Sequence, residues 1–286
     1  MRKKAGFLGF VTGIIGLLMA GGALAEENGV SKLTAGQAYE RMQSGDPVVV
    51  VDVRTKEEYD AGHIEGAVLI PNEEIGEIKP DLLPVEDAEI LIYCRSGNRS
   101  AQAAAKLMEL GYTKVSDFGG INDWTYETVD TPWEDKAATL ASFRAADLNG
   151  QIRDESFFAS AELTMVNVWA TYCGPCLREM PELGELSQEY ADKGVQIAGV
   201  VIDTRNSDGT IVQSQVEQAR ALAAQTGAEY VHLLPTSDLI QAGLGGIYSV
   251  PTTFFVNADG EQVGETYVGS RSKEDWSAII DEVSAQ

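Results

Sequence analysis

The sequence predicts an α/β protein with two domains, the first of them built on a parallel sheet. Runs of β-branched and aliphatic residues alternate with helix-like segments along most of the chain, and this order is typical of sheets covered by helices. A chain of 286 residues also has room for two domains of ordinary size. We expect a leader at 1–25, a first domain at 26–130, a linker at 131–137 and a second domain at 138–286.

The first 25 residues have the pattern of a secretory signal peptide. A basic start, Arg2-Lys3-Lys4, precedes an uncharged stretch from Ala5 to Ala25 that ends in Ala-Leu-Ala, a small-residue cleavage pattern. The alternative is an uncleaved N-terminal membrane anchor, because the stretch is long enough to span a bilayer. In both cases the basic end stays inside, so we expect the rest of the chain in the periplasm or otherwise outside the cytoplasm.

Composition limits the class of partner. The formal net charge of −23 argues against nucleic acid or an anionic membrane surface as a partner. Hydrophobic residues make up 44% of the chain and charged residues 23%, which is typical of globular domains that can each build a core.

In the first domain, strands alternate with short helices. The run from Val48 to Val53 is rich in valine, which is typical of a buried parallel strand, and Ile90–Tyr93 is a similar run. The other elements that we expect there are strands at 67–70 and 114–118 and helices at 56–61 and 101–110.

Cys94 directly follows the strand at 90–93 and precedes a helix. Open α/β sheets bind their ligands at this end of the strands. The backbone N–H groups of the loop from Cys94 to Ser100 can form a nest for an anion, and Arg95 and Arg99 add positive charge. We therefore expect the loop to hold a thiolate or a persulfide and to bind an anionic sulfur donor. The alternative is a buried structural cysteine.

The second domain also alternates strands with helices. Asn257–Gly260 reads as the turn of a hairpin between its last two strands. The predicted strands lie at 143–148, 163–169, 195–203, 230–234, 252–256 and 262–268, and the predicted helices at 176–191, 213–226 and 276–283.

Cys173 and Cys176 form a Cys-x-x-Cys pair at the start of the predicted helix. The helix N-terminus favours a thiolate on Cys173, and the thiolate is the form that attacks disulfides. Pro175 suits a first helical turn. A zinc site needs four ligands, whereas the chain has three cysteines and two histidines that are distant in sequence, His63 and His232. We expect redox chemistry, with no metal and no cofactor, rather than a structural cysteine pair.

The first domain resembles the rhodanese family. The matching segments are Asp52–Arg54, Gly62–Ala67, the loop from Cys94 to Ser100, and Gly119–Trp124. The resemblance implies that Cys94 carries the transferred sulfur as a persulfide. Related phosphatases use Cys-x5-Arg, whereas Arg99 stands at Cys-x4-Arg, the sulfur-transfer length. His63 is interpreted as structural. The loop residues expected to bind the substrate are Arg95, Ser96, Gly97, Asn98 and Arg99.

The second domain resembles the TlpA/ResA-like branch of the thioredoxin superfamily. The motif from Val166 to Pro181 carries this resemblance, together with Val250-Pro251-Thr252, which matches the cis-proline loop of the family, and an insertion at about 203–226. The resemblance implies that Cys173 attacks, that Cys176 resolves the mixed disulfide, and that Pro251 packs against the pair. The Gly-Pro dipeptide between the cysteines is the reducing type of the family.

Two residues depart from thioredoxin itself. Asn167 stands where thioredoxin has a buried aspartate, and asparagine cannot take up a proton. Glu179, one helical turn after Cys176, is a candidate for that role. The alternative for Glu179, a solvated surface carboxylate, has equal weight.

The resulting prediction is an exported thiol-disulfide oxidoreductase, acting as a reductant, with a linked sulfurtransferase site. Its substrates would be disulfide-bearing proteins or persulfides, and a membrane thiol carrier would return electrons to it. One alternative is a sulfurtransferase whose persulfide is reduced by the second domain. Another is a first domain that serves only for docking or sensing. A thiosulfate–cyanide assay distinguishes these alternatives.

Overall fold

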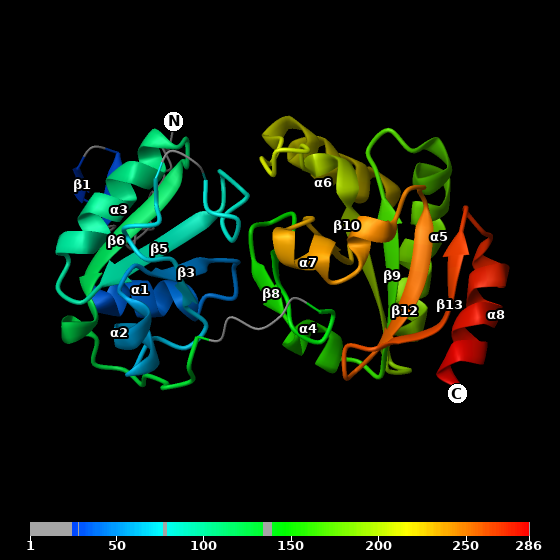
Figure 1. Ribbon diagram of the computed structural model, residues 1–286, viewed down its shortest axis with the longest axis horizontal. Helices are drawn as coiled ribbons and strands as arrows, with labels where there is room; N and C mark the ends of the chain where they lie inside the picture. The colour runs from blue at the N-terminus through cyan, green and yellow to red at the C-terminus, as the bar shows by residue number, and fades with distance from the viewer. Residues whose placement is uncertain (1–24, 28, 77–78, 134–138, 286) are drawn as a thin grey trace, which may run out of the picture.

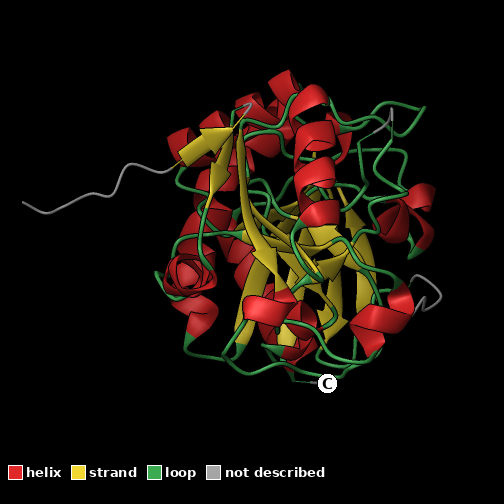
Figure 2. Cartoon of the chain, turned by 90° about the vertical axis from the view of Figure 1, so that its left-hand side faces the viewer, coloured by secondary structure: helices red, strands yellow, loops and turns green. Residues whose placement is uncertain are grey.

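The computed structural model describes residues 25–27, 29–76, 79–133 and 139–285, arranged as two α/β domains (Figure 1). The predicted leader lies outside the described residues, apart from Ala25. Within the described ranges no helix is long and apolar enough to cross a membrane. Seen with the first domain toward the viewer, the strands of the two domains overlap in projection, with helices around them (Figure 2).

The first domain is a six-stranded sheet of order β1-β2-β6-β5-β3-β4, in which every pairing except β1–β2 is parallel. The parallel register brings the carboxyl ends of β3, β5 and β6 to one edge, where Cys94 pairs with Gly120. The strands are β1 Ala25–Glu27, β2 Val30–Lys32, β3 Val49–Asp52, β4 Val68–Leu69, β5 Glu89–Cys94 and β6 Lys114–Gly120, and the helices are α1 Ala35–Met42, α2 Lys56–Asp60, α3 Asn98–Glu109 and the 3-10 turn η1 Ile121–Asp123.

The second domain has a five-stranded sheet of order β11-β10-β9-β12-β13. The central strands β9, β10 and β11 are parallel, while β12 and β13 are antiparallel to their neighbours. The sheet strands are β9 Leu163–Trp169, β10 Val195–Val201, β11 Val231–Leu233, β12 Thr252–Asn257 and β13 Gln262–Val268. A separate hairpin consists of β7 Arg144–Ala146 and β8 Ile152–Asp154, and the helices are α4 Ser156–Ala159, α5 Gly174–Ala191, η2 Ile202–Thr204, α6 Gln213–Thr226, α7 Ser237–Gln241, η3 Leu244–Gly246 and α8 Lys273–Ser284.

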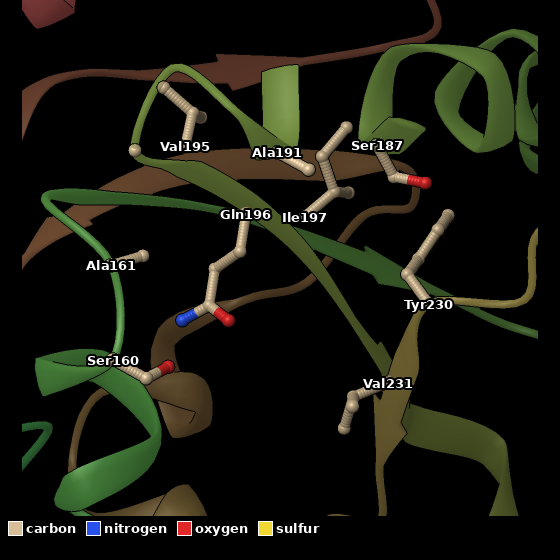
Figure 3. Close-up of a pocket in the computed structure, with 10 residues that line it drawn as sticks. Ser160, Ala161, Ser187, Ala191, Val195, Gln196, Ile197, Tyr230 and Val231 are labelled. Carbon is tan, nitrogen blue, oxygen red and sulfur yellow. The ribbon is translucent and has the colours of Figure 1, made fainter. Parts of the chain in front are cut away.

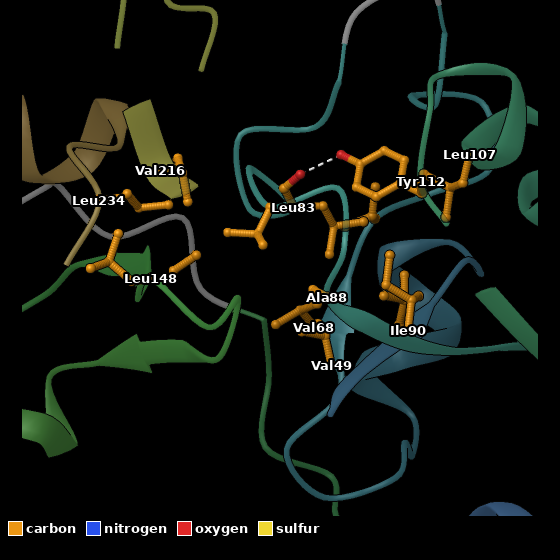
Figure 4. Close-up of a cluster of buried hydrophobic side chains, with 14 of the residues drawn as sticks. Val49, Val68, Leu83, Ala88, Ile90, Leu107, Tyr112, Leu148, Val216 and Leu234 are labelled. Atoms are coloured by element: carbon orange, nitrogen blue, oxygen red, sulfur yellow. Dashed lines mark hydrogen bonds between the residues drawn. The ribbon is translucent and has the colours of Figure 1, made fainter. Parts of the chain in front are cut away.

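The loop at 79–88 of the first domain docks on α6 and its surroundings in the second domain. Buried apolar side chains from both domains belong to one cluster, which contains Leu83, Val85 and Ala88 on one side and Leu148, Val216 and Leu234 on the other (Figure 4). Gly150 lies so close to the loop that a Cβ there would stand 2.4 Å from the Cβ of Ala88. The two domains therefore share a closely packed apolar contact.

Polar groups fix the same interface. The side chain of Gln213 accepts a hydrogen bond from the N–H of Glu86 at 3.3 Å and donates to the carbonyl of Pro84 at 2.5 Å. The guanidinium of Arg220 binds both carboxylate oxygens of Asp87 at 2.8 Å. Because backbone groups of the loop are held by α6, the contact has a defined register as well as apolar area.

This interface lies at the amino end of β5, whereas Cys94 closes the carboxyl end of the same strand. At about 3.3 Å per residue, the strand separates Glu89 from Cys94 by about 17 Å. The sulfur loop thus lies at the edge of the sheet away from the docking loop.

Candidate functional sites

Cys173 and Cys176 form a disulfide at the amino end of α5, with their Cα atoms 5.3 Å apart. Cys173 is the N-cap of the helix, and its sulfur accepts a hydrogen bond from the N–H of Cys176 at 3.2 Å. The side chain of Cys173 is 5% exposed, whereas that of Cys176 is fully buried. An incoming sulfur can therefore reach Cys173 only, and the helix N-terminus stabilises negative charge there.

A carboxylate from a distant strand end holds the loop before the cysteines. Asp203 accepts hydrogen bonds from the N–H of Thr171 at 3.0 and 3.1 Å and from its hydroxyl at 2.5 Å. The N–H of Cys173 in turn donates to the carbonyl of Ala170 at 3.0 Å. Sequence reasoning named no role for Asp203. Asp203 is the last residue of the strand predicted at 195–203, and this position at the end of a buried strand was the available signal.

The Val250–Pro251 peptide bond is cis, which confirms the expectation from the Val-Pro-Thr motif. The following residue, Thr252, pairs with Val168 on β9, so the proline loop lies beside the strand that leads to the cysteines. The carbonyl of Pro251 accepts a hydrogen bond from the N–H of Gly269 at 2.8 Å.

Glu179 is buried behind the pair, so its interpretation as a solvated surface carboxylate is wrong. Its carboxylate accepts hydrogen bonds from the side-chain amide of Asn167 at 3.1 Å, the N–H of Arg271 at 3.1 Å and the indole of Trp276 at 3.4 Å. Burial raises the pKa of Glu179, and these donors offset only part of that effect. The carboxyl group therefore stays protonated to a higher pH than an ordinary glutamate.

We expect Glu179→Gln to lower the pKa of at least one thiol of the reduced pair. An ionised carboxylate disfavours a second negative charge nearby, and glutamine removes that charge while keeping the size of the side chain. Alkylation rate against pH, measured on the reduced chain, gives the thiol titration. Glu182→Gln, on the same helix but only half-buried, serves as the control. Superimposable curves for Glu179→Gln and the parent would contradict this role.

Cys94 is buried and free, and it lies at the end of β5 under the loop that begins α3. Its sulfur accepts a hydrogen bond from the N–H of Gly97 at 3.1 Å. Burial raises the pKa of the Cys94 thiol, but hydrogen bonds from Ser100, Ser96 and Gly97 outweigh it, so the net pKa is lowered. The loop thus favours a thiolate, as an anion nest would.

Two glycines give the sulfur loop its shape. Gly97 has a φ of +94°, a conformation that side chains disfavour, and it is the residue before α3. A Cβ on Gly120 would lie 2.4 Å from the carbonyl oxygen of Arg95. The end of β6 can therefore approach the loop closely only because Gly120 has no side chain.

The predicted substrate-binding residues lie on this loop, but its two arginines differ. The side chains of Arg95, Ser96 and Asn98 are exposed. The guanidinium of Arg99 instead holds both oxygens of Glu58, at 2.6 and 2.8 Å, and this lowers the pKa of Glu58 to about 2. Sequence reasoning did not find Glu58. Arg95 is therefore the more exposed of the two arginines, whereas Arg99 already has a carboxylate partner.

The structure confirms a structural role for His63. Its ring is buried and stacks on Tyr59 with centroids 3.5 Å apart, and its Nδ1 lies 3.0 Å from the carbonyl oxygen of Tyr59. Arg54, from the predicted Asp-Val-Arg motif, pairs with buried Asp52 and donates to the carbonyl of Gly62. These contacts build the frame of the first domain rather than a site.

A further pocket lies near the amino end of β10 (Figure 3). Its lining is mostly small or apolar and includes Ser160, Ala191 and Ile197. The side-chain amide of Gln196 is already held by the carbonyl of Phe157 and the hydroxyl of Thr164. Since no cysteine lines this pocket, we place the sulfur chemistry at the two cysteine sites.

Comparisons with known proteins divide the chain in the same way. The family described as Rhodanese-like domain matches residues 34–127, and the family described as Redoxin matches residues 135–282. A thiosulfate sulfurtransferase, PspE of Escherichia coli, is 38% identical over 73 residues, or 26% of this chain and 70% of that protein. A protein described as a sulfurtransferase, from Allochromatium vinosum, is 38% identical over 33% of this chain and 88% of its own length. The thiol-disulfide oxidoreductase ResA of Bacillus thuringiensis is 27% identical over 50% of this chain and 75% of its own length.

Proposed function

Because the chain belongs to the Redoxin family through residues 135–282 and carries a rhodanese-like domain at 34–127, we propose that it is a thiol-disulfide reductant with a linked persulfide-carrying site. We propose that this reductant is exported. It combines a thioredoxin-like oxidoreductase domain with a rhodanese sulfurtransferase-like domain. The observation that carries the proposal is the arrangement of the cysteine pair, with Cys173 at the helix N-terminus and Cys176 buried behind it.

The proposed reduction has two steps. The Cys173 thiolate attacks one sulfur of a substrate disulfide, so that a mixed disulfide forms and the other substrate sulfur leaves as a thiolate. The Cys176 thiolate then attacks the sulfur of Cys173, which releases the second substrate thiol and closes the Cys173–Cys176 disulfide. Two electrons pass to the substrate, and a membrane thiol carrier would return two electrons to the chain. Buried Glu179 would exchange the proton of the Cys176 thiol.

A reductant should have a reduction potential nearer that of thioredoxin, about −270 mV, than that of the strongly oxidising members of the superfamily, about −120 mV. The measurement is the equilibrium of the Cys173–Cys176 pair with the glutathione couple, followed on the full chain. A value near the oxidising end would reverse the proposed direction of electron flow.

The second candidate function is sulfur transfer at Cys94. Support for it comes from the lowered thiol pKa, the hydrogen bond from Gly97 to the sulfur, and the exposed side chain of the next residue, Arg95. The thiolate would attack the sulfane sulfur of a donor such as thiosulfate, form a Cys94 persulfide and release sulfite. A thiol or cyanide acceptor would then remove the outer sulfur and restore the thiolate.

Export is proposed from the first 25 residues alone. A basic start, an uncharged stretch and an Ala-Leu-Ala end are typical of a cleaved leader. An extracytoplasmic location also suits a chain whose pair must meet substrate disulfides, because disulfides persist outside the cytoplasm. Fractionation of the expressing cells, with N-terminal sequencing of the product, tests both the location and the cleavage.

A further inference from the structure

His232 is a buried titratable residue that the proposed chemistry does not use. It lies on β11 and is 4% exposed. Its Nδ1 accepts a hydrogen bond from the indole N–H of Trp169 at 3.0 Å, and its Nε2 lies 2.8 Å from the carbonyl oxygen of Ala228. Because a carbonyl only accepts, Nε2 carries the hydrogen and Nδ1 keeps its lone pair. The imidazole is thus a neutral, fixed acceptor for Trp169.

The sheet leaves room for this bond. Gly199 on β10 pairs directly with His232, between β9 and β11. A Cβ on Gly199 would lie 2.1 Å from Nδ1 of His232 and 3.0 Å from the indole nitrogen of Trp169. Glycine is therefore required at the position that the hydrogen bond crosses.

Trp169 connects His232 with the redox site. It is the last residue of β9, it is fully buried, and it belongs to the same apolar cluster as Cys173 and Cys176. The carbonyl of the next residue, Ala170, accepts the N–H of Cys173. The orientation of the Trp169 ring therefore affects the packing around the disulfide and the loop that presents it.

We propose that His232 is a positioning residue for the redox site, holding the Trp169 indole in place through its neutral Nδ1. The inference rests on the proposed function of the cysteine pair. A proton on Nδ1 would place a donor against the donor of Trp169, so acid would break the bond. Burial lowers the pKa of His232 to about 4, which keeps the acceptor available near neutral pH.

Several titratable side chains lie near His232, and its two neighbouring arginines are already paired with carboxylates. Tyr230, on the same segment, contacts the ring with centroids 4.5 Å apart. The cavity beside His232 is also lined by Asp147, Arg153, Glu229 and Arg220. Arg153 pairs with Asp147 at 2.9 Å and Arg220 with Asp87 at 2.8 Å, so each arginine has a carboxylate of its own.

The test compares two variants of the full chain. His232→Asn places an amide oxygen near the position of Nδ1 and does not titrate, whereas His232→Leu fills the space without an acceptor. The first readout is hydrogen exchange of the Trp169 indole, assigned by NMR with Trp169→Phe. The second is the equilibrium of the Cys173–Cys176 pair with glutathione. His63→Asn, at the buried histidine of the other domain, is the matched control.

At pH 7 we expect His232→Leu to speed exchange of the Trp169 indole about fivefold, as for the loss of one net hydrogen bond. We expect the glutathione equilibrium of His232→Leu to shift as well. His232→Asn should stay close to the parent in both readouts. Near pH 4 the indole exchange rate of the parent should approach that of His232→Leu. The His232→Asn chain should keep its hydrogen bond to Trp169. The double variant Trp169→Phe/His232→Leu should have the same glutathione equilibrium constant as the single variant Trp169→Phe. The two changes should not add, because both act through the same contact.

Unchanged indole exchange and an unchanged glutathione equilibrium in His232→Leu would overturn the inference. Equal losses in His232→Asn and His232→Leu would also overturn it, because they would indicate packing alone. Both readouts are independent of substrate turnover. A parent chain that fails to reduce any disulfide would therefore refute the proposed function without deciding the role of His232.

Discussion

Cys173→Ser is expected to slow the reduction of insulin disulfides by the full chain on the order of a thousandfold or more, since the attacking sulfur is lost. Cys176 cannot substitute for it, because its side chain is fully buried. Insulin turbidity with dithiothreitol as electron source measures the rate. Cys94→Ser is the control and should reduce insulin as the parent does. Unchanged turnover in the Cys173→Ser chain would rule out this pair as the redox site.

Cys176→Ser should behave differently from Cys173→Ser. Attack by Cys173 still proceeds, but the mixed disulfide has no resolving thiol, so it accumulates. Non-reducing gels of the variant isolated from its own compartment should show adducts that dithiothreitol removes. The trapped proteins would identify the natural substrate class.

The second large effect is expected at Cys94. Cys94→Ser should abolish sulfur transfer from thiosulfate to cyanide, because the sulfur-accepting thiolate is gone, while Cys173→Ser should leave that transfer intact. Thiocyanate formation by the full chain measures it. A parent chain without activity would favour the alternative in which the first domain only docks or senses.

Substitutions of Arg95 and Arg99 should have different effects in the thiosulfate–cyanide assay. Arg95, the residue after Cys94, has an exposed side chain, whereas the guanidinium of Arg99 is held by Glu58. Arg95→Gln should therefore raise the thiosulfate concentration needed for half-maximal rate. Arg99→Gln should act chiefly on stability, because it leaves the half-buried carboxylate of Glu58 without its partner.

The docked interface bears on why the two centres share one chain. A dithiol can cleave a persulfide, so Cys173 could in principle release the sulfur of Cys94 as sulfide. The docking loop holds the second domain at the amino end of β5, however, and Cys94 lies at the carboxyl end. Such a relay within one chain would require the interface to open. We therefore expect each cysteine centre of a docked chain to act on external partners.

Strong local patterns made much of the fold predictable. The strands Leu163–Trp169 and Gln262–Val268 and the helix Gln213–Thr226 have the bounds that were expected. Short elements with weak patterns were missed, including α1, α7 and β8. The start of α1 did carry a signal, because Thr34 and Gln37 form a capping box.

The reactive cysteines could be found from the sequence because their spacing and their position after strands are local features. Their supporting residues could not be found in this way. Asp203, Glu58 and His232 come from distant segments and act through tertiary contacts. Burial of Glu179 depends on partners as far along the chain as Trp276. From the sequence alone, a proton-exchanging role and a solvated surface carboxylate therefore had equal weight.

Two cysteine centres with different chemistry are proposed to operate in one chain, Cys94 as a sulfur carrier and the Cys173–Cys176 pair as a reductant. Peptide mass spectrometry of the reduced full chain, after exposure to thiosulfate and insulin together, follows both centres in one experiment. We expect one added sulfur atom on Cys94 and a disulfide between Cys173 and Cys176 in the same preparation. An unmodified Cys94, or a Cys173–Cys176 pair that stays reduced, would contradict it.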